Sequence, residues 1–296
     1  MKTPIFTGSA VALITPFTET GVDYEGLGRL IDWQIQEGTD AIVSCGTTGE
    51  SSTMSHEEHI EVVRYTVQRT AGRVPVIAGT GSNSTAEALS LSQEAEKAGA
   101  DALLLVTPYY NKATQTGLVQ HYLYLADRVN SPIILYNVPS RTGLSFTAAS
   151  YKALSAHPNI NGIKEASGNV TLVAQTRALC GDDLNIWSGN DGDIIPLMSL
   201  GTQGVISVLA NVAPRETAEM CRMWFDGRIR ESGDRQIRYQ ELVDALFCEV
   251  NPIPVKTAVN LMGLPGGLLR MPLCQMEAKN LAFLQTAMRN AGIALA

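Results

Sequence analysis

A lysine closes one of the short apolar runs of the chain, at Lys164 in Gly162-Ile163-Lys164-Glu165. A lysine at the end of a buried strand points into a partly desolvated mouth, where burial disfavours the charged ammonium. The neutral amine can then attack a ketone, which is what Schiff-base catalysis requires. The alternative is a structural ion pair between Lys164 and its neighbour Glu165, and the local sequence leaves both interpretations open.

Two other segments offer groups that a lysine of this kind needs. Tyr136 ends the preceding apolar run, and its phenol can pass protons to and from an imine intermediate. The turn Gly46-Thr47-Thr48-Gly49-Glu50 supplies two hydroxyls and backbone donors, a suitable receptor for a small carboxylate. The alternatives are a buried tyrosine that only hydrogen-bonds a backbone carbonyl and an ordinary Gly-rich turn.

Arg141 follows Tyr136 closely and can hold a second carboxylate through two parallel hydrogen bonds, although an exposed loop arginine is the alternative. His56 and His59 lack the His-Glu-x-x-His spacing of a zinc site, and no cysteine accompanies them. We interpret them as a solvated pair of histidines and expect no metal site.

The elements that must position these groups alternate along the chain. Short, almost continuously apolar runs are typical of parallel strands covered on both faces, and segments with helical spacing separate them. This order predicts an α/β fold, a (β/α)₈ TIM barrel, in which reactive groups lie at the C-terminal ends of the strands. Two half-barrel units or an open doubly wound sheet are the alternatives, but no Gly-x-Gly-x-x-Gly follows the first run. The predicted strands are Ala10–Ile14, Ala41–Cys45, Pro75–Ala78, Ala102–Val106, Ile133–Tyr136, Gly162–Lys164, Asn185–Trp187 and Gly204–Val208.

Local signals mark several helix ends. Ser55 with Glu58 and Ser84 with Glu87 have the spacing of capping boxes, and Gly99 is suited to the end of a helix. After the eighth predicted strand the alternation stops, so we expect a catalytic barrel over residues 1–226 and a C-terminal helical appendage over 227–296. The predicted helices of this region are Pro214–Asp226, which closes the barrel, and Arg228–Val250, Pro254–Met262 and Gln275–Asn290.

Composition limits the partners and the compartment. The 296 residues are 45% hydrophobic and 17% charged, with a net charge of -7, so a nucleic-acid partner is not expected. The first residues lack the apolar core of a signal peptide, and every apolar run is too short to cross a bilayer, which predicts a cytoplasmic protein with no membrane partner. Five scattered cysteines without a Cys-x-x-Cys pair predict reduced, mostly buried thiols.

Four ordered motifs give the chain a resemblance to the dihydrodipicolinate synthase family, over essentially its whole length. It continues through Ser188-Gly189-Asn190-Asp191 and Gly204-Val205-Ile206-Ser207 to Asn251-Pro252-Ile253-Pro254-Val255-Lys256. The resemblance implies condensation of pyruvate with L-aspartate 4-semialdehyde, in lysine and diaminopimelate biosynthesis, without a metal or organic cofactor. The four motifs are Gly46–Glu50, Val106–Asn111, Tyr136–Gly143 and Gly162–Glu165.

The same resemblance implies roles for individual residues. Lys164 matches the Schiff-base lysine and Tyr136 the proton donor and acceptor, while Thr47 and Tyr110 match the rest of a proton relay. In the family this second tyrosine reaches across a dimer interface, which implies a homo-oligomer, usually a tetramer built as a dimer of dimers. The substrate-binding positions implied are Thr48 for the pyruvate carboxylate, Arg141, Gly189 and Ile206.

Two other functions are compatible with these residues. An aldolase for 2-keto sugar acids, of the N-acetylneuraminate lyase or 2-keto-3-deoxy-gluconate type, shares the lysine, the tyrosine and the Gly-rich turn. Arg141 is the discriminator, because the Arg-Thr-Gly sequence resembles the synthases that bind a small amino-acid aldehyde. A non-catalytic sensor of pyruvate or lysine is the other alternative, but every relay position carries the matching residue.

A second set of residues resembles the site at which lysine-sensitive members of the family bind L-lysine. Glu87 can pair with the α-ammonium, Asn83 and Tyr109 can hold the carboxylate, and His56 with Ser51 can receive the side-chain amine. Ser52 departs from the small apolar residue often found there, and Glu87 has an alternative role as a capping residue. The full set is Ser51, Ser52, His56, His59, Asn83, Glu87 and Tyr109.

Overall fold

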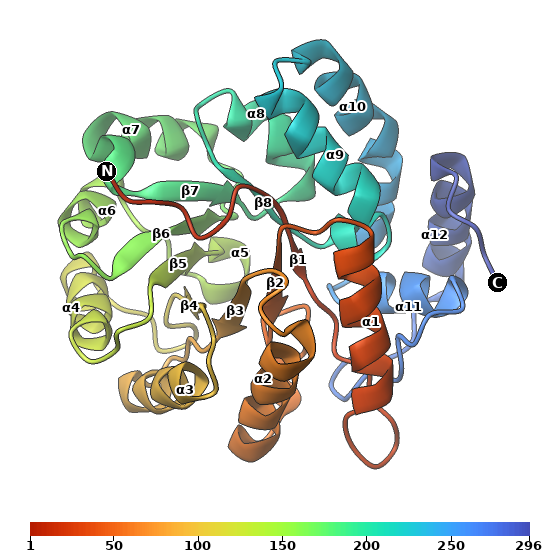
Figure 1. The fold of residues 1–296 in the computed structure, drawn as a ribbon, viewed down its shortest axis with the longest axis horizontal. Helices are drawn as coiled ribbons and strands as arrows, with labels where there is room; N and C mark the ends of the chain where they lie inside the picture. The colour runs from red at the N-terminus through yellow and green to blue at the C-terminus, as the bar shows by residue number, and fades with distance from the viewer.

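The computed structural model describes residues 1–296, in which eight parallel strands form a closed barrel in sequence order, β1 through β8. Helices surround the barrel (Figure 1). The predicted fold class, a TIM barrel followed by C-terminal helices, is confirmed. The strands are β1 Gly8–Ala12, β2 Ala41–Ser44, β3 Val76–Gly79, β4 Ala102–Val106, β5 Ile133–Asn137, β6 Ile160–Glu165, β7 Asn185–Ser188 and β8 Gly204–Ser207.

The strands read as continuous apolar runs because both of their faces are covered. Alternate residues point to opposite faces, and one set fills the interior of the barrel, with Ile134, Trp187 and Ile206 among its members. The other set packs against the helices in a larger cluster that includes Val11, Leu103 and Ile163. Closure of the sheet thus gives every strand an inner and an outer buried face.

One predicted strand is displaced. The expected run Ala10–Ile14 is observed as Gly8–Ala12, because Gly8 pairs with Gly204 of β8. The backbone amide of Ile14 donates instead to the side-chain oxygen of Asn211 at 3.1 Å. The Leu13 amide still donates to the Val43 carbonyl of β2 at 3.0 Å. The buried apolar run therefore extends past the end of the strand, and the apolar pattern alone does not mark where the strand ends.

The barrel helices begin where polar caps were expected, with one correction. The hydroxyls of Ser55 and Ser84 accept hydrogen bonds from the backbone amides of Glu58 and Glu87. The glutamate side chains do not complete the capping boxes, because Glu58 pairs with Arg270 and Glu87 bonds Ser82 and His56. The helices and short helical turns of the barrel are α1 Tyr24–Gln36, α2 His56–Thr70, α3 Thr85–Lys97, α4 Gln115–Ala126, α5 Pro139–Thr142, α6 Ala148–Ser155, α7 Val170–Cys180, α8 Ile194–Met198 and α9 Pro214–Phe225.

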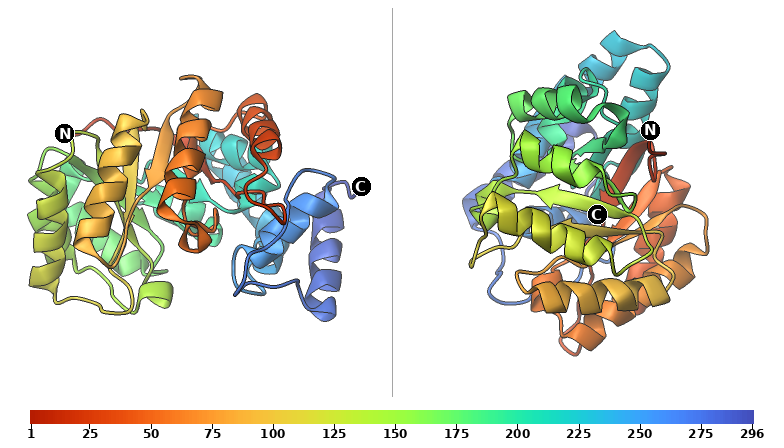
Figure 2. Two further views of the ribbon diagram at one scale, coloured as in Figure 1. Left: turned by 90° about the horizontal axis from the view of Figure 1, so that it is seen from below. Right: turned by 90° about the vertical axis from the view of Figure 1, so that its left-hand side faces the viewer.

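Three further helices follow without intervening strands: α10 Ile229–Leu246, α11 Ile253–Leu261 and α12 Ala278–Ala291. Figure 2 shows α11 and α12, drawn in blue, to one side of the barrel. α10 packs against both α9 and α12, so it connects the barrel to the last helices. None of the helices is long and apolar enough to span a membrane.

The cysteines are all free thiols, and three of the five, Cys45, Cys180 and Cys221, are buried. This agrees with the expectation of reduced, mostly buried thiols. Gly99 ends its helix with φ +92°, a left-handed conformation that glycine adopts without strain.

Candidate active site

Tyr136 and Lys164 lie side by side on neighbouring strands. They are register partners on β5 and β6, and Lys164 Nζ is 4.4 Å from the centre of the Tyr136 ring. Tyr136 belongs to the inner cluster of the barrel, and so does Ala166, two residues beyond Lys164 on the same face of the chain. The lysine therefore points into the barrel, and its side chain is buried beside the phenol.

Glu165 points to the opposite face of β6 and makes no ion pair with Lys164. Its carboxylate accepts hydrogen bonds from Tyr151 Oη at 2.8 Å, from Asn137 Nδ2 at 2.9 Å and from the backbone amide of Ser167 at 2.9 Å. The pKa of Glu165 is raised, because burial raises it by more than these hydrogen bonds lower it. The alternative of a Lys164–Glu165 pair is wrong, because consecutive strand residues face opposite sides of the sheet.

The turn after β2 is held in an unusual backbone conformation. Cys45, directly before the turn, and Glu50, its last residue, have φ of +54° and +55°. Gly79 of β3 lies against this turn, and a β-carbon there would come within 2.3 Å of the Cys45 carbonyl oxygen. Thr47 lines a small cavity of about 50 Å³ together with Tyr136. The predicted turn and the predicted tyrosine therefore face the same space.

Thr48 is buried beside the C-terminal region. Its Oγ1 lies 3.0 Å from Asn251 Nδ2, which donates the hydrogen bond. Glu50, also buried, pairs with Lys256 of α11 at 2.5 Å. The sequence motif that begins at Asn251 was noted only as part of the resemblance, and its position against the turn was missed.

Another part of the mouth is formed by the ends of β7, which pairs with β6, and β8. Gly189 donates its backbone N–H to the Glu165 carbonyl at 2.8 Å, and Ile206 is fully buried in the inner cluster. Asp191, which had no predicted role, accepts from Ser207 Oγ at 2.5 Å and from the backbone amides of Val208 and Leu209. Burial raises the pKa of Asp191. This carboxylate ties the end of β8 to the loop that carries Gly189.

Arg141 lies on α5, directly after β5, and its Nη2 donates to the Asn251 carbonyl at 2.9 Å. It lines a cavity of about 420 Å³ that also contains Thr47. Tyr109, which is 38% exposed, lines the same cavity. The predicted carboxylate receptor and the relay threonine are thus brought together.

Most of the predicted L-lysine set lines this cavity as well, namely Ser51, Ser52, His56, His59, Glu87 and Tyr109. His56 Nε2 lies 2.6 Å from Glu87 Oε1, and Ser82 also donates to this carboxylate. The hydrogen bonds from Ser82 and His56 lower the pKa of Glu87. Asn83 is not among the lining residues, and its backbone carbonyl accepts from Asn111 Nδ2 at 2.9 Å.

His59 does not form a solvated pair with His56. It is only 6% exposed, its Nε2 lies 2.8 Å from the Gly79 carbonyl oxygen, and burial lowers its pKa. The prediction was wrong for this residue because α2 packs its His59 face against β3, while His56 at the first position of the helix stays exposed.

Tyr110 projects from the surface. Its side chain is 92% exposed and its φ is +67°. Within the single chain it does not line the cavity that Thr47 shares with Tyr136.

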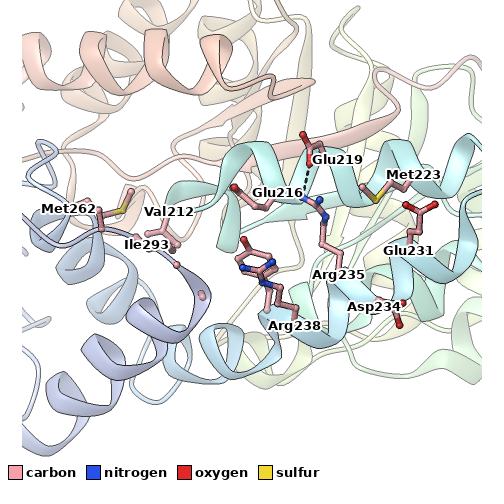
Figure 3. Close-up of a pocket in the computed structure, with 14 residues that line it drawn as sticks. Val212, Glu216, Glu219, Met223, Glu231, Asp234, Arg235, Arg238, Met262 and Ile293 are labelled. Carbon is pink, nitrogen blue, oxygen red and sulfur yellow. Dashed lines mark hydrogen bonds and ion pairs between the residues drawn. The ribbon is translucent and has the colours of Figure 1, made fainter.

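A larger cavity, of about 730 Å³, lies elsewhere, between α9, α10 and the end of the chain (Figure 3). Arg235 pairs with Glu219 across it at 2.6 Å, while Met262 and Ile293 form its apolar end. None of the predicted site residues lines it. The candidate site is formed instead by the two smaller cavities at the strand ends, of about 420 and 50 Å³.

A closed parallel barrel with a buried lysine and tyrosine on adjacent strands defines the class of aldolase-type barrel enzymes. The model of the dihydrodipicolinate synthetase family matches residues 5–291, and the chain belongs to this family.

Relatives of known name support the assignment. The 4-hydroxy-tetrahydrodipicolinate synthase of Thermoanaerobacter pseudethanolicus is 53% identical, over 98% of each chain. The dihydrodipicolinate synthase of Acinetobacter baumannii, solved in complex with pyruvate, is 43% identical with a TM-score of 0.94, over 97% of this chain and 99% of that one. The enzyme of Cyanidioschyzon merolae, solved with lysine bound, is 40% identical with a TM-score of 0.95, over 99% and 100%.

Proposed function

We propose that the chain catalyses the 4-hydroxy-tetrahydrodipicolinate synthase reaction, the condensation of pyruvate with L-aspartate 4-semialdehyde. The observation that carries the proposal is the inward-facing pair of Lys164 and Tyr136, with Thr47 facing the same space as the phenol. The sequence identity to named synthases, over nearly the whole chain, supports the same reaction.

The chemistry begins with the Lys164 amine, which attacks the ketone carbon of pyruvate. Loss of water leaves a protonated imine, and removal of a proton from the methyl group gives an enamine. The enamine carbon attacks the aldehyde, and the amino group of the second substrate then displaces Lys164 by transimination and closes the ring. No metal or organic cofactor takes part, because the protonated imine is itself the electron sink.

The proposed roles in binding and proton transfer rest on the family resemblance, and the positions of Tyr136 and Thr47 support them. Tyr136, beside Lys164, passes protons, with Thr47 and Tyr110 as the rest of the relay. Thr48 binds the pyruvate carboxylate, and Arg141 binds the carboxylate of the semialdehyde. Gly189 and Ile206 line the pyruvate pocket from β7 and β8.

Oligomerisation and regulation form the second part of the proposal. The exposure of Tyr110 supports a role in the site of a neighbouring subunit, within a homotetramer built as a dimer of dimers. The cavity lined by His56, Glu87 and Tyr109 supports L-lysine as an inhibitor. The resemblance adds Asn83 to the proposed site. We also propose a cytoplasmic enzyme with a barrel over 1–226 and a helical domain over 227–296.

Steady-state turnover with pyruvate and L-aspartate 4-semialdehyde tests the proposal directly. The matched comparison is aldol cleavage of N-acetylneuraminate and of 2-keto-3-deoxy-gluconate by the same preparation. We expect turnover with pyruvate and the semialdehyde, and no cleavage of either sugar acid. Preferential cleavage of a sugar acid would replace the proposal with an aldolase, and binding of pyruvate without any turnover would indicate a sensor.

A further inference from the structure

The segment between α10 and α11 returns to the mouth of the barrel and places Asn251 between two predicted substrate ligands. Asn251 Nδ2 donates to Thr48 Oγ1 at 3.0 Å. The main-chain carbonyl of the same residue accepts from Arg141 Nη2 at 2.9 Å. One residue of the C-terminal region therefore contacts the receptors proposed for both carboxylates.

The direction of the first hydrogen bond determines what Thr48 can offer to a ligand. A hydroxyl has one proton and two lone pairs, whereas a carboxylate only accepts. Because Thr48 Oγ1 accepts from Asn251 Nδ2, its own proton is left free to donate. A hydroxyl that donated to a protein carbonyl would instead turn its lone pairs toward the substrate carboxylate and weaken binding.

The second contact sets the guanidinium of Arg141. The group carries five N–H donors in a rigid plane, and the Asn251 carbonyl is its only hydrogen-bond partner within the chain. No carboxylate of the protein pairs with it, so the remaining donors and the positive charge are available to a ligand carboxylate.

A buried ion pair fixes the C-terminal segment against the turn. Lys256 and Glu50, both 1% exposed at their side chains, pair at 2.5 Å. Glu50 also accepts from the backbone amide of Arg270 at 3.0 Å. Glu50 has a left-handed backbone conformation, which is unfavourable for a residue with a side chain. The contacts with Lys256 and Arg270 therefore help to hold Glu50 at the end of the turn that carries Thr48.

Asn251 has one further feature, since its Oδ1 is buried and has no partner. The donor of the Asn251 amide is therefore the group that bonds the protein, while its oxygen does not. We propose that Asn251 is a positioning residue, which holds the Thr48 hydroxyl as a donor to the pyruvate carboxylate through its side chain and orients Arg141 through its main chain. This inference rests on the proposed function and deepens it.

Asn251→Asp and Asn251→Ala test the side-chain half of the inference. An aspartate of the same shape can only accept, so Thr48 must donate to it and the added charge repels pyruvate. We expect the KM for pyruvate to rise about thirtyfold for Asn251→Asp and about fivefold for Asn251→Ala, with a smaller change in kcat. The KM for the semialdehyde should change less than twofold, because the carbonyl that orients Arg141 remains.

A double-mutant cycle with Thr48→Val separates positioning from general loss of structure. In the Thr48→Val background, which lacks the hydroxyl, adding Asn251→Ala should raise the pyruvate KM less than twofold. Asn290→Ala, which removes an exposed amide bonded to Glu241, is the matched control and should leave both KM values unchanged. Effects that multiply fully, or an unchanged pyruvate KM in Asn251→Asp, would overturn the inference.

Trapping of the pyruvate imine with borohydride distinguishes this inference from the proposed function. If the wild-type chain traps no pyruvate, the proposed function fails and the inference with it. If the wild type is trapped and turns over while the Asn251 variants match its pyruvate dependence, only the inference fails. Asn251→Asp has the shape of asparagine, so it answers the question even where Asn251→Ala unfolds the chain.

Discussion

Gly189 leaves the space that the Lys164 side chain occupies. A β-carbon on Gly189 would lie 3.1 Å from both Cγ and Cε of Lys164 and 2.6 Å from the β-carbon of Ala166. The absence of a side chain at this position therefore permits the lysine to adopt its buried conformation in the barrel.

Gly189→Ala should slow formation of the pyruvate imine at least tenfold, because the added methyl group displaces Lys164. Gly233→Ala is the control, since nothing lies within 4 Å of a β-carbon there. Mass spectrometry after borohydride reduction measures the adduct, which we expect on Lys164 in the wild type. An adduct on Lys256, or none, would contradict the assignment of the Schiff-base lysine.

Arg141→Ala should impair use of the semialdehyde much more than formation of the pyruvate imine. Loss of a charge-assisted contact to the substrate costs on the order of 1.5 to 3 kcal/mol in transition-state binding. The measurements are kcat/KM for the semialdehyde and the rate of imine trapping with pyruvate alone. Equal losses in both would mean that Arg141 organises the pocket, and Arg64→Ala, on the exposed face of α2, serves as control.

Tyr110 should act in the site of a neighbouring subunit, because its side chain is 92% exposed within its own chain. Mixing inactive Tyr110→Phe and Lys164→Ala subunits under exchange conditions is expected to restore part of the activity. In a mixed dimer one site combines an intact lysine with an intact tyrosine. Mixtures that stay inactive, while wild-type subunits exchange normally, would show that each site is built from one chain.

L-lysine should inhibit turnover partially, and Glu87→Ala and His56→Ala should each weaken its binding several-fold. The proposed site uses Glu87 as the acidic partner for the ligand ammonium, and the Oε1 of this residue lies 2.6 Å from His56 Nε2. Calorimetry and inhibition curves measure the effect, with Glu94→Ala, whose carboxylate pairs with Lys97, as the control. No binding at millimolar lysine would leave these residues with a purely structural role.

His121 should make the stability of the fold depend on pH. Burial lowers its pKa to about 4, and its Nδ1 lies 2.9 Å from Thr85 Oγ1. In the unfolded state the His121 imidazole is protonated near pH 6.5, whereas in the folded state it stays neutral down to about pH 4. The contribution of neutral His121 to the free energy of unfolding is therefore complete above pH 6.5 and is lost as the pH falls toward 4. The loss is on the order of 3 kcal/mol in the free energy of unfolding.

Denaturant unfolding of the wild type and of His121→Gln between pH 7 and pH 4 measures this contribution. The variant should lose less stability over the interval, whatever its stability at neutral pH. Tyr124→Phe, an exposed substitution on the same helix, should retain the wild-type slope. Parallel slopes for His121→Gln and the wild type would show that other groups cause the pH dependence.

Much of the fold and of the reactive centre was predictable from local sequence. Strands covered on both faces must be apolar throughout, so their positions, and with them the strand-end places of Tyr136 and Lys164, follow from short-range pattern. The alternation of side chains along β6 also separates Lys164 from Glu165. The division into domains at residue 226 and the roles of the site residues remain proposals.

Only the tertiary structure decided which distant residues complete the site. Asn251 lies 203 residues from Thr48, and Lys256 lies 206 residues from Glu50, so no local period or motif spacing relates them. The same is true of Glu58, which pairs with Arg270 instead of capping its own helix, and of His59, which packing against β3 buries. Local sequence specifies the elements because backbone geometry repeats over a few residues. Contacts between elements depend on how the closed barrel and the returning C-terminal helices meet.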